Sequence, residues 1–178
     1  MSAAASRLLS ALTTQGDATD WARTAGLLLL FAVCVVPAGL ATGFLRPVSP
    51  RGLDRNRRIV LAAAVFVTPA LAEEVAFRAL PLSFPGREHL WPWATASLVA
   101  FVVYHPVKAA LPGASAAKRA TFTDPFFLGF ATLLGAACTV AFVTSGSLWP
   151  PVALHGSVVA AWLLYLGGYD RLTEGFPP

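Results

Sequence analysis

The chain alternates long apolar runs with short polar segments, and five of these runs approach the length of a transmembrane helix. Such a helix needs about 20 consecutive, predominantly apolar residues. Pro, Gly and ionisable residues interrupt the runs, but a membrane helix tolerates them where neighbouring helices satisfy the freed polar groups. The pattern therefore predicts an all-α fold, a polytopic membrane helical bundle of about five transmembrane helices. The runs cover approximately residues 24–45, 59–82, 91–111, 125–144 and 148–167.

The same pattern divides the chain into segments with different expected roles. Most of the apolar runs belong to one continuous core, which also holds the candidate chemistry described below. The expected segments are a polar or amphipathic N-terminal stretch (1–23), a first transmembrane helix (24–45), a basic cytoplasmic loop (46–58), the intramembrane core (59–167) and a C-terminal tail (168–178).

Composition supports an integral membrane protein and argues against several other classes. Hydrophobic residues make up 56% of the 178 residues and charged residues only 12%, with a mean hydropathy of +0.65. Soluble domains carry about 25% charged residues. The net charge of +4 does not indicate a nucleic-acid partner, because the basic residues are spread over loops rather than along one helix face. Cys34 and Cys138 both lie in apolar runs, so neither a disulfide framework nor a metal site follows from the cysteines.

Lys and Arg are concentrated on one side of the predicted membrane. The positive-inside rule then places the N-terminus outside and the C-terminus in the cytoplasm. The Arg-rich loop 46–58 would lie near anionic lipid, which makes membrane lipid an expected partner. The N-terminus lacks the character of a transit peptide, which favours a bacterial inner membrane. The nine residues of the basic side are Arg46, Arg51, Arg55, Arg57, Arg58, Lys108, Lys118, Arg119 and Arg171, against Arg7, Arg23 and Arg87 on the other.

Three ionisable residues interrupt the second apolar run: Glu73, Glu74 and Arg78. An ionised side chain near the centre of a bilayer costs about 2.5–3.5 kcal/mol on insertion scales, so such residues are candidates for a functional site. Glu74 and Arg78 are four residues apart and share a helix face, which predicts an ion pair. Glu73 is rotated by about 100° from Glu74 on a helix, so it is expected to face a cavity as the reactive carboxylate. The alternative is that all three residues form one structural charge network.

Two histidines are also predicted to lie at membrane depth. His105 belongs to the third run and His155 to the fifth, whereas His89 lies in a polar loop and is expected to be solvated. A carboxylate and two imidazoles can activate water, because a general base takes a proton from the water while an imidazole orients it or protonates the leaving group. Packing of the bundle is therefore expected to bring Glu73, His105 and His155 together.

These residues resemble the motifs of the CPBP family of intramembrane proteases, which includes the CAAX prenyl endopeptidases and the Abi-type, bacteriocin-processing relatives. The resemblance covers about residues 69–166, with the motifs in the family's order. The first motif, Glu-Glu-x-x-x-Arg, matches Glu73, Glu74 and Arg78; the second, Phe-x-x-x-His, matches Phe101 and His105; the third, Phe-x-x-Gly, fits Phe126 and Gly129; and the fourth matches in His155.

The resemblance implies an intramembrane endopeptidase of the glutamate type. Glu73 would activate a water held jointly with His105, and His155 would help to stabilise the oxyanion. Glu74 and Arg78 would shape the site. The substrate would be a membrane-associated peptide or protein, either CAAX-type or bacteriocin-type. No cofactor is expected, although a zinc ion held by Glu73, His105 and His155 is a minor alternative.

One position departs from the family pattern. The residue four positions after the fourth-motif histidine is Val159 instead of Asn or Asp. Losing one oxyanion donor typically costs about 10²–10³ in rate. Tyr104 and Thr144 are possible replacement donors by residue type, whereas Ser157 is expected to point away from His155. The alternative function is therefore a catalytically weak or silent family member that acts as a membrane scaffold or immunity-type protein. A transporter with Glu73 as a proton relay is disfavoured by the short chain without a repeat.

Overall fold

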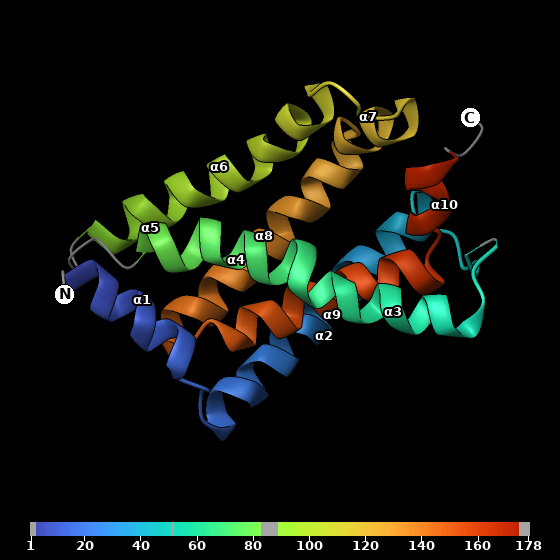
Figure 1. Ribbon diagram of the computed structural model, residues 1–178. Coiled ribbons are helices and arrows are strands. Elements are labelled where there is room, and N and C mark those ends of the chain that lie inside the picture. Colours follow the sequence, from blue (N-terminus) through green and yellow to red (C-terminus); the bar gives the residue numbers. More distant parts are fainter. Residues whose placement is uncertain (1–2, 51, 83–88, 175–178) are drawn as a thin grey trace.

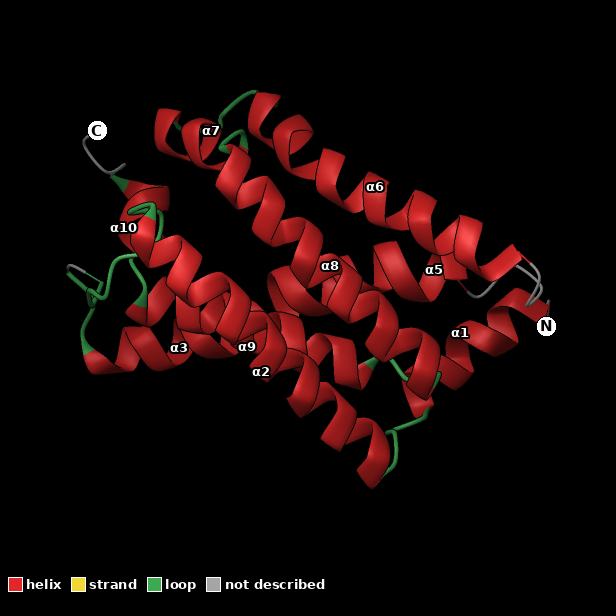
Figure 2. Ribbon diagram, turned by 180° about the vertical axis from the view of Figure 1, so that it is seen from behind, coloured by secondary structure: helices red, strands yellow, loops and turns green. Residues whose placement is uncertain are grey.

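The structure is a computed structural model, and it describes residues 3–50, 52–82 and 89–174. These residues form an all-α bundle without a named strand among them (Figure 2). Arg51 and Arg87, two of the cations used to predict the topology, lie outside the described residues. In chain order the elements are α1 (Ala3–Thr13), α2 (Ala18–Ala41), α3 (Arg55–Val65), η1 (Phe66–Leu71), α4 (Ala72–Glu74), η2 (Val75–Ala79), α5 (Leu80–Leu82), α6 (Leu90–Ala110), α7 (Ala116–Phe122), α8 (Pro125–Ser145), α9 (Trp149–Tyr165) and α10 (Gly168–Thr173).

Four helical stretches in the described part of the chain are long and apolar enough to cross a membrane, which confirms the predicted polytopic bundle. They are Ala18–Ala41, Arg55–Leu82, Leu90–Ala110 and Pro125–Ser145. The fifth expected run forms α9, which has 17 residues. At 1.5 Å per residue such a helix is about 25 Å long, shorter than the hydrocarbon core of about 30 Å.

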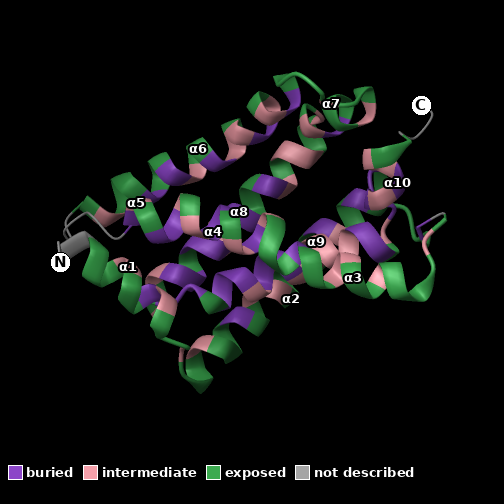
Figure 3. Ribbon diagram, in the orientation of Figure 1, coloured by how far each residue is buried: buried purple, intermediate pink, exposed green. Residues whose placement is uncertain are grey.

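The short helix α9 lies inside the bundle and packs against α2, α3, η1 and α8. Figure 3 shows buried positions gathered around α4, α8 and α9, whereas the outward faces of α3 and α6 are largely exposed. Exposed apolar side chains such as Ile59, Val60, Val99 and Val103 lie on those outward faces. This arrangement suits a helix bundle whose outer surface contacts lipid and whose centre contains the polar residues.

A single bent helical segment, α3 to α5, crosses the molecule and carries the Glu-Glu-x-x-x-Arg cluster (Figure 1). The helix is broken at Thr68, whose backbone is extended (φ −138°, ψ 112°), directly before Pro69. Proline disfavours helical geometry in the residue before it and has no N–H to continue the helix. Two π-helical turns, η1 and η2, flank α4. Turns of this kind often occur at functional sites in helices.

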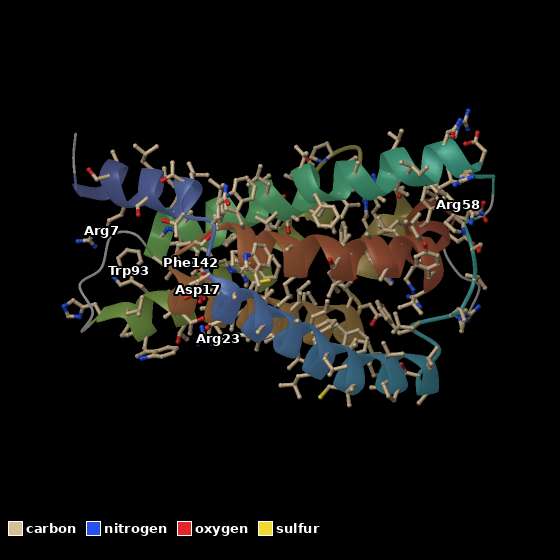
Figure 4. The ribbon with its side chains drawn as sticks, turned by 90° about the horizontal axis from the view of Figure 1, so that it is seen from below. Arg7, Asp17, Arg23, Arg58, Trp93 and Phe142 are labelled. Carbon is tan, nitrogen blue, oxygen red and sulfur yellow. The ribbon has the colours of Figure 1, made fainter. Side chains whose placement is uncertain are left out.

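The two ends of the bundle differ in charge. Figure 1 places α7, α10 and the loop that leads into α3 toward one end, and α1, α5 and the start of α6 toward the other. Figure 4 shows Arg58 at the first end and Arg7, Arg23 and Trp93 at the opposite end. The cations of α7 and α10, Lys118, Arg119 and Arg171, are therefore near the Arg58 end. This separation supports the grouping used to predict topology, while the direction of insertion stays a prediction.

Local signals in the sequence explain where the helices begin. Asp17 and Asp20 form a reciprocal capping box at the start of α2: the Asp20 N–H donates to Asp17 Oδ1 at 2.9 Å and the Asp17 N–H donates to Asp20 Oδ2 at 3.1 Å. Asp124 caps α8 by accepting from the Phe126 N–H at 2.8 Å, with Pro125 at the first helical position. The α8 start matters for the site because α8 supplies one wall of the cavity described next.

Candidate active site

Glu74 and Arg78 form a buried ion pair in the centre of the bundle. Their side chains are fully buried, and Arg78 Nη1 lies 3.2 Å from Glu74 Oε1, as their spacing on one helix face predicts. Arg78 Nη2 also donates to the Gly135 carbonyl oxygen of α8 at 2.9 Å, and the guanidinium carbon lies 4.4 Å from the centre of the Phe101 ring. Arg78 thus ties the broken helix to α6 and α8, and its charge is balanced by Glu74.

His155 joins this network from α9. Its Nδ1 lies 2.7 Å from Glu74 Oε1, so one carboxylate oxygen accepts from both Arg78 and His155. Because an ionised carboxylate can only accept, Nδ1 carries the hydrogen, and Nε2 of a neutral ring is an acceptor. That Nε2 lies 3.8 Å from Glu73 Oε2. Residue spacing along the chain does not predict this contact, because the two residues lie on separate helices.

His105 is oriented by its own helix. Its Nδ1 lies 2.9 Å from the Phe101 carbonyl oxygen, which can only accept, so Nδ1 is the protonated nitrogen of the neutral ring. Nε2 then carries a lone pair. The imidazole is surrounded by aromatic rings, with the centres of the Phe101 and Phe127 rings 5.0 and 5.1 Å away. This packing fixes the plane of the ring.

Glu73, His105 and His155 all line one cavity of about 570 Å³. This value is within the range of roughly 300–1,000 Å³ that is typical of ligand sites. Glu73 itself is 7% exposed, whereas Glu74 is completely buried. The walls are mostly apolar and come from α2, α8 and α9, with Leu28, Phe31, Val35, Phe130, Leu134 and Val158 among the lining residues. The three expected reactive residues are therefore brought to one apolar chamber from three helices.

Some residues of the predicted motifs lie elsewhere. Phe126 is 46% exposed, and a methyl group added at Gly129 would meet no neighbouring atom within 4 Å, so the third motif lies on the outer face of α8. Phe127 and Phe130 line the cavity from the same helix. Phe101 of the second motif does line the cavity, and its ring centre is 5.9 Å from that of His155.

The residues considered as replacement oxyanion donors, Tyr104 and Thr144, do not lie at the cavity. Thr144 donates to the Val140 carbonyl oxygen at 2.8 Å near the end of α8, and Tyr104 packs against Phe77 with ring centres 5.4 Å apart. Neither residue belongs to the lining of the cavity. Ser157 and Val159 both line it. The cavity therefore reaches both faces of α9, and Ser157 lines it even though a residue two positions after His155 is expected to point away from that histidine.

Lys108 is a site residue that the sequence did not identify. It was expected in a cytoplasmic loop, but it lies in the last turn of α6 and lines the cavity. Its Nζ is 3.8 Å from Glu73 Oε1, and its side chain is 41% exposed. The available signal was its spacing, because a residue three positions after His105 lies on the same face of a helix.

The potential metal ligands form a different set from the one considered in the sequence. Among the described residues, the group whose ligand atoms all lie within 4.8 Å of one another consists of Glu74, Cys138 and His155. Glu73, His105 and His155 do not form such a group in that part of the chain. The Arg78 guanidinium contacts Glu74 directly and disfavours a further cation there.

Comparison with known families gives one match. The model of the family described as "Type II CAAX prenyl endopeptidase Rce1-like" matches residues 55–161, about three fifths of the chain. The matched range includes Glu73, Glu74, Arg78, His105 and His155. No curated protein and no solved structure matches the chain.

Proposed function

Since the chain belongs to the Rce1-like family of type II CAAX prenyl endopeptidases, we propose that it is an intramembrane protease whose general base is Glu73. The observation that carries this proposal is the position of Glu73: a buried carboxylate that lines an apolar cavity together with His105 and His155. The chain is an integral membrane protein of a protease family.

The contacts of the two adjacent glutamates support different roles for them. Glu74 is fully buried and accepts hydrogen bonds from Arg78 and His155. The nearest basic groups to Glu73, on Lys108 and His155, are 3.8 Å away, too far for a direct hydrogen bond. Among the described residues, Glu73 therefore retains acceptor capacity for a water molecule, whereas Glu74 is committed to holding the site together.

The proposed reaction is hydrolysis of a peptide bond by an activated water. The water donates one hydrogen bond to Glu73 and a second to the free Nε2 of His105. Its oxygen attacks the carbonyl carbon as Glu73 takes a proton, and the electron pair of the C=O π bond moves to the oxygen. The tetrahedral intermediate then collapses: the C–N bond breaks, and the proton on Glu73 passes to the leaving nitrogen. His155 holds α9 against the Glu73–Glu74 turn through the hydrogen bond that its Nδ1–H donates to Glu74.

The apolar cavity supports a membrane-associated substrate. Phenyl and aliphatic side chains make up most of the wall, so a lipid-modified or apolar peptide tail would bury its apolar surface there. We propose a CAAX-type tail as the substrate, with a bacteriocin-type leader as the competing class. The cavity includes Lys108 at the end of α6, near the α7 end of the bundle. If the basic end is cytoplasmic, as the charges predict, the substrate enters from the cytoplasmic side in a bacterial inner membrane.

The test compares cleavage by the wild type, Glu73→Gln and the control Glu174→Gln in the same detergent. Glu174 is an exposed carboxylate beyond α10, so its substitution leaves the cavity unchanged. Each protein receives a farnesylated C-terminal peptide, the same peptide without the lipid and an apolar leader peptide. Because a general base contributes about 10²–10⁴ in rate, Glu73→Gln should lose cleavage by that factor while the control retains it. A folded Glu73→Gln protein that cleaves at the wild-type rate would refute the assignment.

The alternative function, a membrane scaffold or immunity-type protein without turnover, is favoured by one observation. Val159 lines the cavity where the family pattern has Asn or Asp, and its side chain offers no hydrogen-bond donor. In this case the folded wild type leaves all three peptides intact. The same cleavage assay therefore decides between the two functions.

A further inference from the structure

The proposed reaction generates an oxyanion, and the two histidines of the site are poorly placed to stabilise it. A neutral imidazole has one N–H. In His105 this N–H is directed to the Phe101 carbonyl oxygen, and in His155 it is directed to Glu74. When both rings are neutral, each Nε2 is therefore unprotonated. An acceptor nitrogen cannot donate a hydrogen bond to a developing negative charge.

Arg78 is a positively charged residue near Glu73, but its guanidinium is already held by other contacts. Arg78 is fully buried, pairs with Glu74, donates to the Gly135 carbonyl oxygen and lies over the Phe101 ring. It does not line the cavity. Moving the guanidinium toward a substrate would leave Glu74 as an uncompensated buried charge, which is strongly unfavourable.

Lys108 has the properties that these groups lack. It is the one Lys or Arg among the described residues that line the cavity, and its Nζ lies 3.8 Å from Glu73 Oε1. The ammonium group is 5.2 Å from the centre of the Tyr104 ring and 5.8 Å from that of Phe122, which holds it toward the site. Its side chain is 41% exposed and flexible, so the group can move by a few ångströms without breaking a buried contact.

We propose, on the basis of the proposed function, that Lys108 is a further catalytic residue that stabilises the oxyanion. When the water attacks, the carbonyl oxygen takes the electron pair of the C=O π bond, and an N–H of Lys108 donates a hydrogen bond to that oxygen. Lys108 keeps its proton throughout, while the proton of the water goes to Glu73 and then to the leaving nitrogen. Charge-assisted hydrogen bonds of this type are about twice as strong as neutral ones. Thr68 and Ser157 also line the cavity, but their side chains carry no charge.

The departure at position 159 provides a direct way to test this role. Val159 is four residues after His155, so both side chains lie on the same face of α9, and Val159 lines the cavity. An Asn at this position would place a neutral amide donor in the chamber. If Lys108 supplies the oxyanion donor in this chain, Val159→Asn should partly replace it.

The experiment measures kcat and KM for the wild type, Lys108→Met, Lys108→Gln, Val159→Asn and the double variant Lys108→Met/Val159→Asn. Lys118→Met on α7 is the control, because Lys118 does not line the cavity. Loss of one oxyanion donor typically lowers kcat by about 10²–10³, so Lys108→Met should do so with little change in KM. Lys108→Gln keeps an uncharged N–H donor and should lose less. The double variant should recover at least about tenfold of that loss, within the contribution of a single donor.

Each outcome decides the proposal. Unchanged kcat in the Lys108 variants, or a double variant no faster than Lys108→Met, overturns it. A loss confined to KM, and seen only with peptides that end in a free carboxylate rather than an amide, assigns Lys108 to substrate binding instead. A wild type that cleaves nothing refutes the proposed function itself, and the role of Lys108 with it. Gel filtration of each variant establishes that folded protein is compared.

Discussion

Glu74 and His155 are 81 positions apart in the chain, yet Glu74 Oε1 and His155 Nδ1 lie 2.7 Å apart in the centre of the bundle. The same oxygen also contacts Arg78 Nη1 at 3.2 Å. One carboxylate therefore connects the broken helix that carries the Glu-Glu-x-x-x-Arg cluster with the central helix α9. Glu73, the neighbouring residue in the sequence, is left to line the cavity.

We expect loss of Arg78 to destabilise the protein as well as reduce cleavage. In Arg78→Met the Glu74 carboxylate loses its buried countercharge, and breaking a buried pair from one side costs about 3–5 kcal/mol. The double variant Glu74→Gln/Arg78→Met should cost less than the sum of the single variants, because both charges are then removed. Unfolding by SDS titration in one detergent measures these differences.

Arg57→Met is the matched control for this prediction. Arg57 pairs with Asp54 at 3.8 Å, but both side chains are largely exposed, so the pair contributes little to stability. Equal unfolding curves for Arg57→Met and Arg78→Met would show that the buried Glu74–Arg78 pair contributes no more to stability than the exposed Asp54–Arg57 pair.

A methyl group added to α8 should distinguish the inner face of this helix from its outer face. In Gly135→Ala the new Cβ would lie 2.7 Å from Leu98 Cδ1 and 2.9 Å from Arg78 Nη2, so neighbouring groups must shift. Overpacking of this kind costs about 1–3 kcal/mol, and displacement of Arg78 should also slow cleavage. Gly129→Ala, on the same helix, meets no neighbouring atom within 4 Å and should be neutral or slightly stabilising. Equal thermal stability of the two variants would contradict the packing seen around Gly135.

Replacement of His105 should affect the reaction more than the fold. His105→Gln removes the acceptor Nε2 that orients the water, and loss of such a group typically lowers the rate by about 10²–10⁴. His89→Gln serves as the control because His89 is exposed at the start of α6. Steady-state cleavage of one peptide by the three proteins provides the comparison. A His105→Gln enzyme as fast as the His89→Gln control would remove His105 from the mechanism.

Chelation of metal ions should leave cleavage intact. The potential ligand Glu74 is already paired with Arg78 and His155, so a divalent cation would have to displace both contacts. We expect dialysis against EDTA and 1,10-phenanthroline to preserve the rate, and elemental analysis of the purified protein to find far less than one zinc per chain. Loss of activity that added zinc restores would instead support the group of Glu74, Cys138 and His155 as a metal site.

The helical character of the protein and the contact between Glu74 and Arg78 could be predicted from the sequence. Apolar runs of transmembrane length predicted the polytopic bundle, and the four-residue spacing of Glu74 and Arg78 predicted their contact. Asp124 before Pro125 has the character of a helix start, and the structure places the start of α8 there. These features depend on short stretches of chain whose geometry follows from helical periodicity.

Contacts between residues on separate helices could not be predicted from the sequence in this way. The bond between Glu74 and His155 depends on how α4 and α9 pack, which one sequence does not determine. Lys108 was counted only among the basic residues of the predicted cytoplasmic side, but α6 continues to Ala110 and brings Lys108 to within 3.8 Å of Glu73. Phe126 and Gly129 matched a motif by spacing, although the structure places both on the outer face of α8. A motif match gives the residue types, whereas the packing of the bundle decides which of them face the cavity.

The wall that α2 contributes to the cavity has a consequence for how this protein could be altered. Leu28, Phe31, Val35 and Val36 line the chamber, but α2 lies outside the range 55–161 that the family model matches. Glu73, His105, Lys108 and His155 all lie inside that range. One wall of the chamber is thus encoded in a different stretch of the chain from the reacting groups. Exchanging residues of α2 alone would therefore alter the volume of the chamber while leaving Glu73, His105, Lys108 and His155 in place.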